Sequence, residues 1–323
     1  MTELPNRRTP GETYLYNNPE HAYQHALRVI KQWKSGNLYL HYLGLTRLPP
    51  IPEGVMFLYC DTNHLTEINQ LPSTLIGLFC DYNLLHTLPK LPSSLYQLNC
   101  SFNQIKDLSI LPPSLEIIQC SNNLLTALPL LPDTLHVLDC SYNPLYCLPP
   151  LPPLLAHLSC AKCYLSILPP LPSYLRHLCC AYNQLTWISA LPSLLEELEC
   201  QFNELVCLPP IPDTMKRVNA IYNEIMEYPK VPLPIHLYLE NNPLQEHLLD
   251  TNMAISIDIT ISLDIALQYS RHCTATKKIG KLQESQKRAN QRCAIIKEDL
   301  IMKIWHPSRV LRLLEAGYDI EDI

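Results

Sequence analysis

The segment Leu75-Ile-Gly-Leu78-Phe-Cys80-Asp-Tyr-Asn83-Leu-Leu85 contains the pattern that decides how this chain folds. The same arrangement of Leu, Cys and Asn recurs every 20 residues along most of the sequence. The cysteine position is filled by Cys60, Cys80, Cys100, Cys120, Cys140, Cys160, Cys180 and Cys200. The asparagine position is filled by Asn63, Asn83, Asn103, Asn123, Asn143, Asn183, Asn203, Asn223 and Asn242, with one interruption at Cys163. A period of this kind is typical of proteins built from stacked repeats.

Written out, each unit reads L-x-x-L-x-C-x-x-N-x-L and continues as L-P-x-L-P. This is the leucine-rich repeat pattern at its shortest length. The segment around each Leu-x-Cys predicts a short strand, and the strands should stack in parallel about 4.8 Å apart. The two prolines predict an extended, polyproline-like return. We therefore expect a leucine-rich repeat solenoid of the α/β class, a horseshoe with a concave parallel sheet and a convex side without helices.

The two repeated polar positions have structural explanations. The asparagine amides can satisfy backbone groups of adjacent turns that the sheet does not reach. The cysteines are small apolar side chains that suit a narrow interior column. Neighbouring cysteines in register would have Cβ atoms about 4.8 Å apart, which is longer than the roughly 3.8 Å that a disulfide prefers. We expect free, buried thiols, and hence a reducing compartment.

The array needs closed ends, because a terminal repeat exposes its core. We divide the chain into an N-terminal helical cap (1–37), the repeat array (38–250) and a mostly helical C-terminal tail (251–323). In the cap, Ala22, Ala26, Ile30 and Trp33 follow helical spacing within Pro19–Trp33. The tail contains a strand-like alternation at 255–265, a basic segment at 277–297 and a short amphipathic helix at 305–317.

Composition excludes several classes of protein. The 323 residues include 24 basic and 30 acidic side chains, for a net charge of -6, and 47% are hydrophobic. This balance argues against disorder and against a general nucleic-acid binder. Pro is frequent (30) and Gly rare (7), and no glycine-rich phosphate loop occurs. No stretch of about 18 apolar residues is present, and the N-terminus has no apolar signal core, so we expect no membrane span.

The residues between the inward-facing positions should lie on the concave face. Near its N-terminal end they include Phe57, Tyr59 and Phe79, and exposed aromatic side chains are favoured in protein-binding sites. Alternatively, the N-terminal helix covers them. Toward the other end the face carries His157, His177, Glu197, Glu199 and Arg217. Arg176, Glu196 and Lys216 should pair along neighbouring strands, which contributes little stability but can set partner specificity.

Two further groups of residues have competing interpretations. His157, His177 and Cys179 include the donor types of a zinc site, but on a nearly flat sheet they would not converge, so we expect no metal and no cofactor. An aromatic column beside the asparagines predicts either a packing spine or a ridge for a partner. Its members are Tyr82, Phe102, Tyr142, Tyr182, Phe202 and Tyr222.

The string Leu38-x-Leu40-x-x-Leu43-Gly-Leu45-Thr-x-Leu48-Pro-Pro-Ile-Pro52, with the L-P-x-L-P repeats over 38–245, resembles the arrays of bacterial secreted effectors of the YopM and IpaH kind. The strings C-S-Y-N and C-S-F-N, as at Cys140–Asn143, resemble arrays encoded by large nucleocytoplasmic DNA viruses. The tail from Trp305 to Asp319 resembles C-terminal tails of such viruses, and Arg309–Asp319 is similar to half an ankyrin repeat. Some of these effectors carry a ubiquitin ligase with a Cys-x-Asp motif, which no cysteine of this chain matches.

The resemblance implies a recognition module that acts on another protein, such as a host protein. We expect a non-catalytic, monomeric protein that binds its partner on the concave face, in the cytoplasm of a host cell, without nucleic acid or membrane. The alternative is an adaptor whose tail, 277–323, recruits a host complex such as a ubiquitin ligase to a target held by the repeats.

Overall fold

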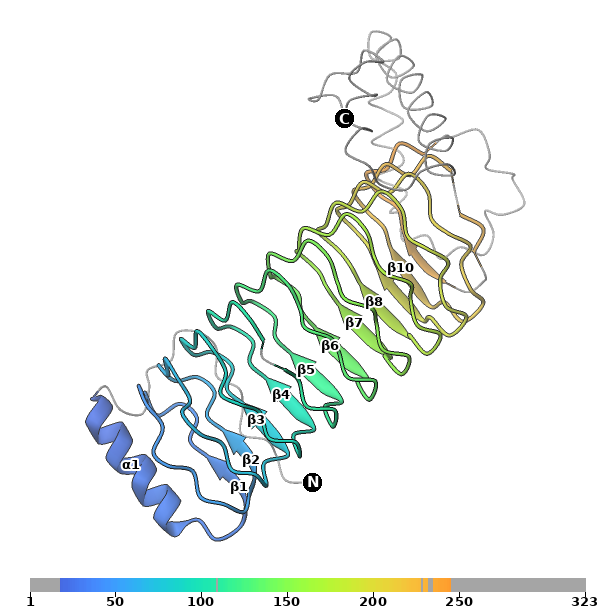
Figure 1. The fold of residues 1–323 in the computed structure, drawn as a ribbon. Coiled ribbons are helices and arrows are strands. Elements are labelled where there is room, and N and C mark those ends of the chain that lie inside the picture. Colours follow the sequence, from blue (N-terminus) through green and yellow to red (C-terminus); the bar gives the residue numbers. More distant parts are fainter. Residues whose placement is uncertain (1–17, 109, 228, 232–234, 245–323) are drawn as a thin grey trace. The chain divides into compact units, whose positions relative to one another are not determined.

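In this computed structural model the repeats form one continuous parallel sheet (Figure 1). The structure describes residues 18–108, 110–227, 229–231 and 235–244. The eleven strands lie side by side in chain order, and each pairs in parallel with the next. They are β1 (Gly36–Tyr39), β2 (Val55–Tyr59), β3 (Gly77–Phe79), β4 (Gln97–Asn99), β5 (Ile117–Gln119), β6 (Val137–Asp139), β7 (His157–Ser159), β8 (His177–Cys179), β9 (Glu197–Glu199), β10 (Arg217–Asn219) and β11 (His236–Tyr238). The predicted leucine-rich repeat solenoid is confirmed.

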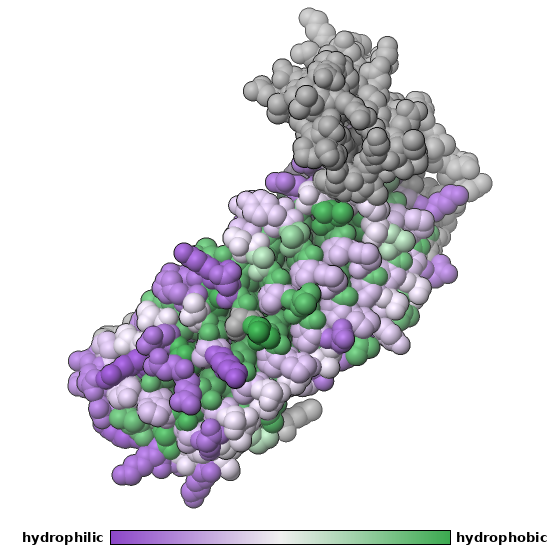
Figure 2. Space-filling view, in the orientation of Figure 1, coloured by the Kyte–Doolittle hydropathy of each residue, from purple (hydrophilic) through white to green (hydrophobic). Residues whose placement is uncertain are grey.

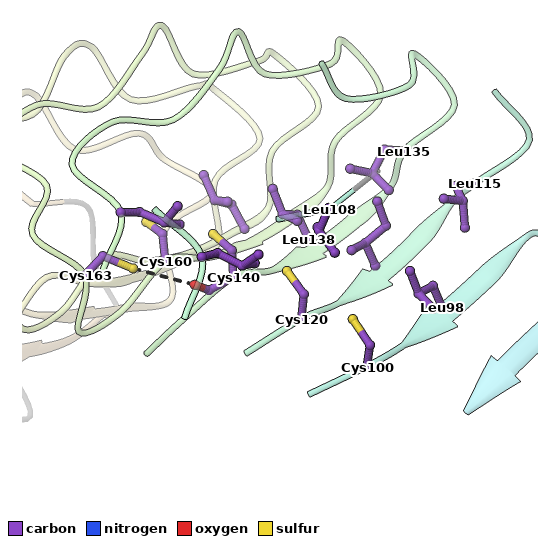
Figure 3. Close-up of a cluster of buried hydrophobic side chains, with 14 of the residues drawn as sticks. Leu98, Cys100, Leu108, Leu115, Cys120, Leu135, Leu138, Cys140, Cys160 and Cys163 are labelled. Atoms are coloured by element: carbon purple, nitrogen blue, oxygen red, sulfur yellow. Dashed lines mark hydrogen bonds between the residues drawn. The ribbon is translucent and has the colours of Figure 1, made fainter. Parts of the chain in front are cut away.

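The strands form where the repeat alternates between inward and outward side chains. The central residue of a typical strand, such as Leu78 in β3, is fully buried, and the cysteine that follows two positions later also points inward. All eight cysteines of the column are fully buried, and Figure 3 shows Cys100, Cys120, Cys140 and Cys160 beside the leucines. They are reduced, and burial raises the pKa of every thiol in the column, to about 12 for Cys100. These thiols are therefore protonated packing groups.

The asparagines hold adjacent turns together, as the sequence predicts. The Nδ2 of Asn83 donates to the backbone oxygens of Cys60 and Cys80, at 3.0 and 3.1 Å, and its Oδ1 accepts from the backbone nitrogen of Leu65 at 2.9 Å. Equivalent bonds form at Asn63, Asn103, Asn123, Asn143, Asn183, Asn203, Asn223 and Asn242. Each amide thus satisfies buried backbone groups in two successive turns.

Cys163 breaks this pattern because a thiol cannot replace the amide. Its Sγ lies 3.6 Å from the backbone oxygen of Cys140, to which it donates a weak hydrogen bond (Figure 3). The backbone nitrogen of Leu145, which would donate to an asparagine, donates instead to the carbonyl oxygen of Asn143 at 2.8 Å. In the same turn, Pro144 has no N–H, whereas the equivalent Leu84 donates to the carbonyl oxygen of Leu65. Two inter-turn hydrogen bonds are therefore lost at one place in the array.

The residue before each asparagine adopts the left-handed backbone conformation. Tyr82 has φ 52° and Phe202 has φ 56°, and nine other residues at equivalent positions share this geometry. Bulky side chains seldom take this conformation. The same conformation occurs here with Tyr, Phe, Thr, Lys and Asn, so the turn after each strand imposes it regardless of the side chain.

The segments that connect one strand to the next, which we call return segments, consist of extended backbone and turns. None of the described residues after the first strand is helical, which agrees with the prediction from the L-P-x-L-P segments. Hydroxyl side chains link neighbouring returns, as where Ser94 Oγ donates to the carbonyl oxygens of Ser73 and Leu75, both at 2.8 Å. On the face visible in Figure 2, apolar residues run along the array among more polar ones.

Helix α1 (Pro19–Gln32) packs against the first turns of the array. It begins where Asn18 Oδ1 accepts from the backbone nitrogens of Glu20 and His21, and Pro19 fits its first turn. Ala22 and Ala26 are fully buried in the core, as their spacing predicts. The described part of the chain contains no helix that could cross a membrane. The features predicted for the tail, 251–323, lie outside the described residues.

Candidate protein-binding surface

The outward side chains of strands β1–β11 form one surface, which we call the sheet face. The eight predicted binding residues all lie on it, in two groups. Phe57, Tyr59 and Phe79 lie on β2 and β3, and the other five lie on β7–β10. Adjacent strands lie about 4.8 Å apart, so about 19 Å separates β3 from β7. The sequence placed all eight on one face, and the structure shows two separate clusters.

The first group, the aromatic cluster, is a stack of parallel rings. The ring centroids of Tyr39 and Tyr59 are 4.9 Å apart, and those of Tyr59 and Phe79 are 4.6 Å apart with an interplanar angle of 3°. Phe57 lies beside this stack, over Gly77. Stacked rings contact one another through their faces, so their edges point to solvent. A flat apolar group of a partner can lie across these edges.

Helix α1 does not hide the aromatic cluster. Tyr39, which the repeat pattern did not include, is 49% exposed, and Phe57, Tyr59 and Phe79 are half-buried. Burial raises the pKa of Tyr59, with smaller contributions from Tyr39 and Asp61. Tyr39 was missed because β1 precedes the first complete repeat. Its place in the column is visible only once β1 is paired with β2.

Gly77 explains why the rings fit. A Cβ at this position would collide with the Phe57 ring and would lie 3.3 Å from Cε2 of Phe79. The sequence pattern places Gly77 and Asn99 among the exposed residues, but both are buried. Gly77 is buried because the Phe57 ring covers it. A residue without a side chain therefore makes room for two aromatic ones.

The second group, the charged cluster, is held together by pairing across strands. The rings of His157 and His177 stack with centroids 4.4 Å apart, and His177 Nδ1 lies 3.3 Å from Glu197 Oε2. Arg217 Nη1 lies 3.2 Å from Glu199 Oε1. The predicted neighbours therefore do contact one another.

A second row of charges flanks this cluster. Glu196 accepts from Arg176 at 2.8 Å and also pairs with Lys216, as predicted. Hydrogen bonds from Lys216 and Arg176 lower the pKa of Glu196. The row is exposed, so its effect on stability is small, while it fixes an ordered pattern of charge.

The histidines and Cys179 do not form a metal site. In the part of the chain that the structure describes, no three His, Cys, Asp or Glu side chains are arranged to hold a metal ion. Cys179 Sγ lies 3.9 Å from Glu199 Oε2 on the next strand. Burial lowers the pKa of His157 and raises that of Cys179.

The rings of the aromatic column beside the asparagines pack on one another and also remain exposed. We call the left-handed positions Tyr82, Phe102, Asn122, Tyr142, Lys162, Tyr182, Phe202 and Tyr222 the rim column. Its rings stack, for example Tyr82 on Phe102 at 4.2 Å and Phe202 on Tyr222 at 4.4 Å. The rings remain accessible, and Tyr182 is 47% exposed. The sequence could identify the column but could not show that packing and exposure coexist.

Known structures are similar to this chain over its repeats. YopM from Yersinia enterocolitica WA-314 is 34% identical, with a TM-score of 0.55 over 62% of this chain. The chain spans 50% of that protein. The functional domain of InlJ from Listeria monocytogenes, which includes a cysteine ladder, is 24% identical with a TM-score of 0.49, covering 65% of this chain and 54% of that one. A Shigella effector leucine-rich repeat domain is 24% identical with a TM-score of 0.39, covering 71% and 81%.

No protein-family model matches the chain, and a search of the curated proteins finds no relative. The likeness to YopM and the strand register agree on the architecture. The chain is thus a leucine-rich repeat solenoid similar to the array of a Yersinia protein.

Proposed function

We propose that this protein is a non-catalytic interaction module that binds a partner protein, of a host cell, on the sheet face. The observation that carries the proposal is the aromatic cluster: four aromatic side chains, held in place by stacking and by Gly77, remain accessible on a rigid sheet. Rigid aromatic side chains lose little entropy on binding and often dominate binding energy. The resemblance to effector arrays supports a host protein as the partner.

The reduced, buried cysteine column supports action in a reducing compartment. The charged cluster supports selection of the partner, because ordered rim charges affect association rate and specificity more than affinity. The adaptor alternative depends on the tail, which lies beyond the described residues, so nothing in the array favours it.

Photo-crosslinking tests the proposal directly. A benzoylphenylalanine would replace Phe57 or His177 on the sheet face and, as the control, Leu130, which is 81% exposed on a return segment. In host-cell extract we expect the same protein to crosslink from both sheet-face positions and not from Leu130. Crosslinking from Leu130 alone would show that the partner uses the return side.

A charge at the centre of the aromatic cluster should abolish this binding. Phe79→Asp removes a stacked ring and adds a carboxylate, and we expect at least a tenfold loss of affinity for the crosslinked partner, about 1.4 kcal/mol. Leu130→Asp, on a return segment away from the sheet face, is the control for added charge. Loss of the circular dichroism signal in Phe79→Asp would instead identify Phe79 as a folding residue.

A further inference from the structure

The sheet face contains a hollow that the sequence did not reveal. It has a volume of about 390 Å³ and lies between the rim column and strands β6–β9. Small side chains form its floor, including Ser141, Ser159 and Ala161. Rings of the rim column form one wall and Asp139, Cys179 and Glu199 the other. We call this hollow the rim groove.

The rim groove has the length of a short peptide. Apart from Phe102, which follows β4, its lining extends from Ser121, just after β5, to Glu199 on β9. Strands about 4.8 Å apart make this span about 19 Å, and an extended chain at about 3.3 Å per residue covers it with about six residues. The small floor side chains of Ser141, Ala161 and Ala181 let a backbone approach closely, while ring edges remain for side-chain packing.

The polar groups of the rim groove call for hydrogen-bond donors. Gln201 Oε1 is buried and has no hydrogen-bond partner among the described residues, which is costly unless a bound molecule supplies a donor. Within residues 18–244, Asp139 accepts from the backbone nitrogen of Ser141, at 3.1 Å, and its cross-strand neighbours Gln119 and Ser159 are uncharged. Glu199, by contrast, is paired with Arg217.

The charges around the rim groove indicate the class of occupant. The lining includes two carboxylates and no basic side chain, and Lys162, the cation of the rim column, lies over the Tyr142 ring at 5.1 Å. Residues 18–244 as a whole contain 17 acidic and 11 basic side chains. A phosphate backbone would be repelled here, whereas a lysine or arginine above Asp139 would be attracted.

We infer that the rim groove binds an extended segment of the partner protein, about six residues long, with a lysine or arginine over Asp139 and a backbone N–H donating to Gln201. This inference rests on the proposed function and adds where on the sheet face, and to what chemistry, the partner binds. The segment crosses the strands, along the array.

A heptapeptide array tests the inference with short peptides in place of the whole partner. Each position of the immobilised peptides is varied through Lys, Arg, Asp, Glu, Ser, Leu and Tyr, and the array is probed with the full-length protein. We expect peptides with Lys or Arg at one central position to be retained, and their Asp or Glu counterparts to be lost. Retention of acidic peptides, or of none, would overturn the inference.

Three variants connect the result to the rim groove. Ser159→Tyr fills the floor, and the fold accepts a ring there because Tyr39 and Tyr59 occupy the same strand position. We expect this variant to lose peptide binding. Asn219→Tyr makes the same change at that position on β10, outside the lining, and should bind normally. Asp139→Asn keeps the acceptor for Ser141 and removes the charge, which should weaken binding of basic peptides about fivefold.

The two proposals fail in different ways. If the crosslinked partner binds Ser159→Tyr as well as it binds the unmodified protein, the rim-groove inference is wrong and the sheet-face function stands. If the sheet-face positions give no crosslink, the proposed function is wrong. Equal melting temperatures for the two tyrosine variants would exclude misfolding as the cause of lost binding.

Discussion

Individual residues show where the repeat departs from its own pattern, and Cys163 is the clearest case. At this position a thiol with long, weak contacts to the carbonyl oxygens of Cys140 and Ala161 stands in place of an amide that makes several hydrogen bonds. The sequence identified the exception. The rerouted bond from Leu145 to Asn143 could not be foreseen, because it depends on the path of the backbone through the turn.

Cys163→Asn should restore the bonds that the asparagine amide makes, though not the one lost at Pro144, and leave the protein as stable or more stable. The new amide can donate to the carbonyl oxygens of Cys140 and Cys160, and each net hydrogen bond contributes about 1 kcal/mol. We expect the melting temperature to rise by about 2–4 °C, measured by circular dichroism. Cys163→Ala serves as the control for thiol removal. A large fall in Cys163→Asn would mean that the turn cannot hold an amide.

Replacing Phe202 separates ring stacking from backbone strain. In the left-handed conformation Ala is strained, while Asn is tolerated, as Asn122 shows at the equivalent position. We expect stability to fall in the order wild type, Phe202→Asn, Phe202→Ala, with about 1 kcal/mol between the two variants. Urea unfolding gives the free energies. The reverse order of the two variants would show that the backbone at this position carries no strain.

His157 should make the protein sensitive to mild acid. Burial, then the charges of His177 and Arg176, lower its pKa below the ordinary 6.5, so the folded state disfavours the protonated ring. Its contribution to stability is therefore present above pH 6.5 and is lost as the pH falls through the lowered pKa. We expect NMR titration to give a value below 6.5. Wild type should lose stability relative to His157→Asn on acidification, and parallel curves would contradict this.

At the scale of the element, the unit of structure is one turn with its asparagine. The sequence predicted these turns well because period, burial and hydrogen-bonding need are all local to a 20-residue unit. The binding clusters were less predictable. The alignment of columns brought Phe57, Tyr59 and Phe79 together, but the stacking with Tyr39 and the burial of Gly77 depend on side-chain geometry. The rim groove forms where the side chains between the rim column and the last strand residues are small, and no sequence motif marks such a space.

Asn123→Ala tests the strength of one turn. It removes the donor to the carbonyl oxygens of Cys100 and Cys120 and the acceptor for the backbone nitrogen of Ile105. Since all of these groups are buried, we expect a loss of about 3 kcal/mol in the free energy of unfolding. Asn242→Ala removes matching bonds in a half-buried setting and should cost less. Equal losses would show that burial does not set the cost.

At the scale of the whole molecule, the array has one hydrophobic core that runs through its turns. One buried cysteine lies in this core in each of eight successive repeats. Cys147 and Cys207 are exposed on the return segments, while the eight cysteines of the column are fully buried. Alkylation therefore distinguishes local from global opening of the array.

We expect iodoacetamide to label Cys147 and Cys207 quickly in the native protein. The cysteine column should react only when the array unfolds, since its thiols are both buried and protonated. Mass spectrometry of the labelled peptides, with and without urea, measures this. Fast native labelling of Cys140 or Cys160 alone would show that the turn at Cys163 opens independently.

The asparagine bonds also have a genetic consequence. Except at Pro144 and Cys163, the turns that carry the asparagine offer the same donors and acceptors to the turn before and the turn after. After an in-frame duplication of one 20-residue unit, the added turn can therefore form the same hydrogen bonds with both neighbours. After deletion of one unit, the two turns that flanked it can form these bonds with each other. The rim groove can in this way be lengthened or shortened by copying errors alone, so the length of the recognised segment is a trait that a lineage can change in a single event.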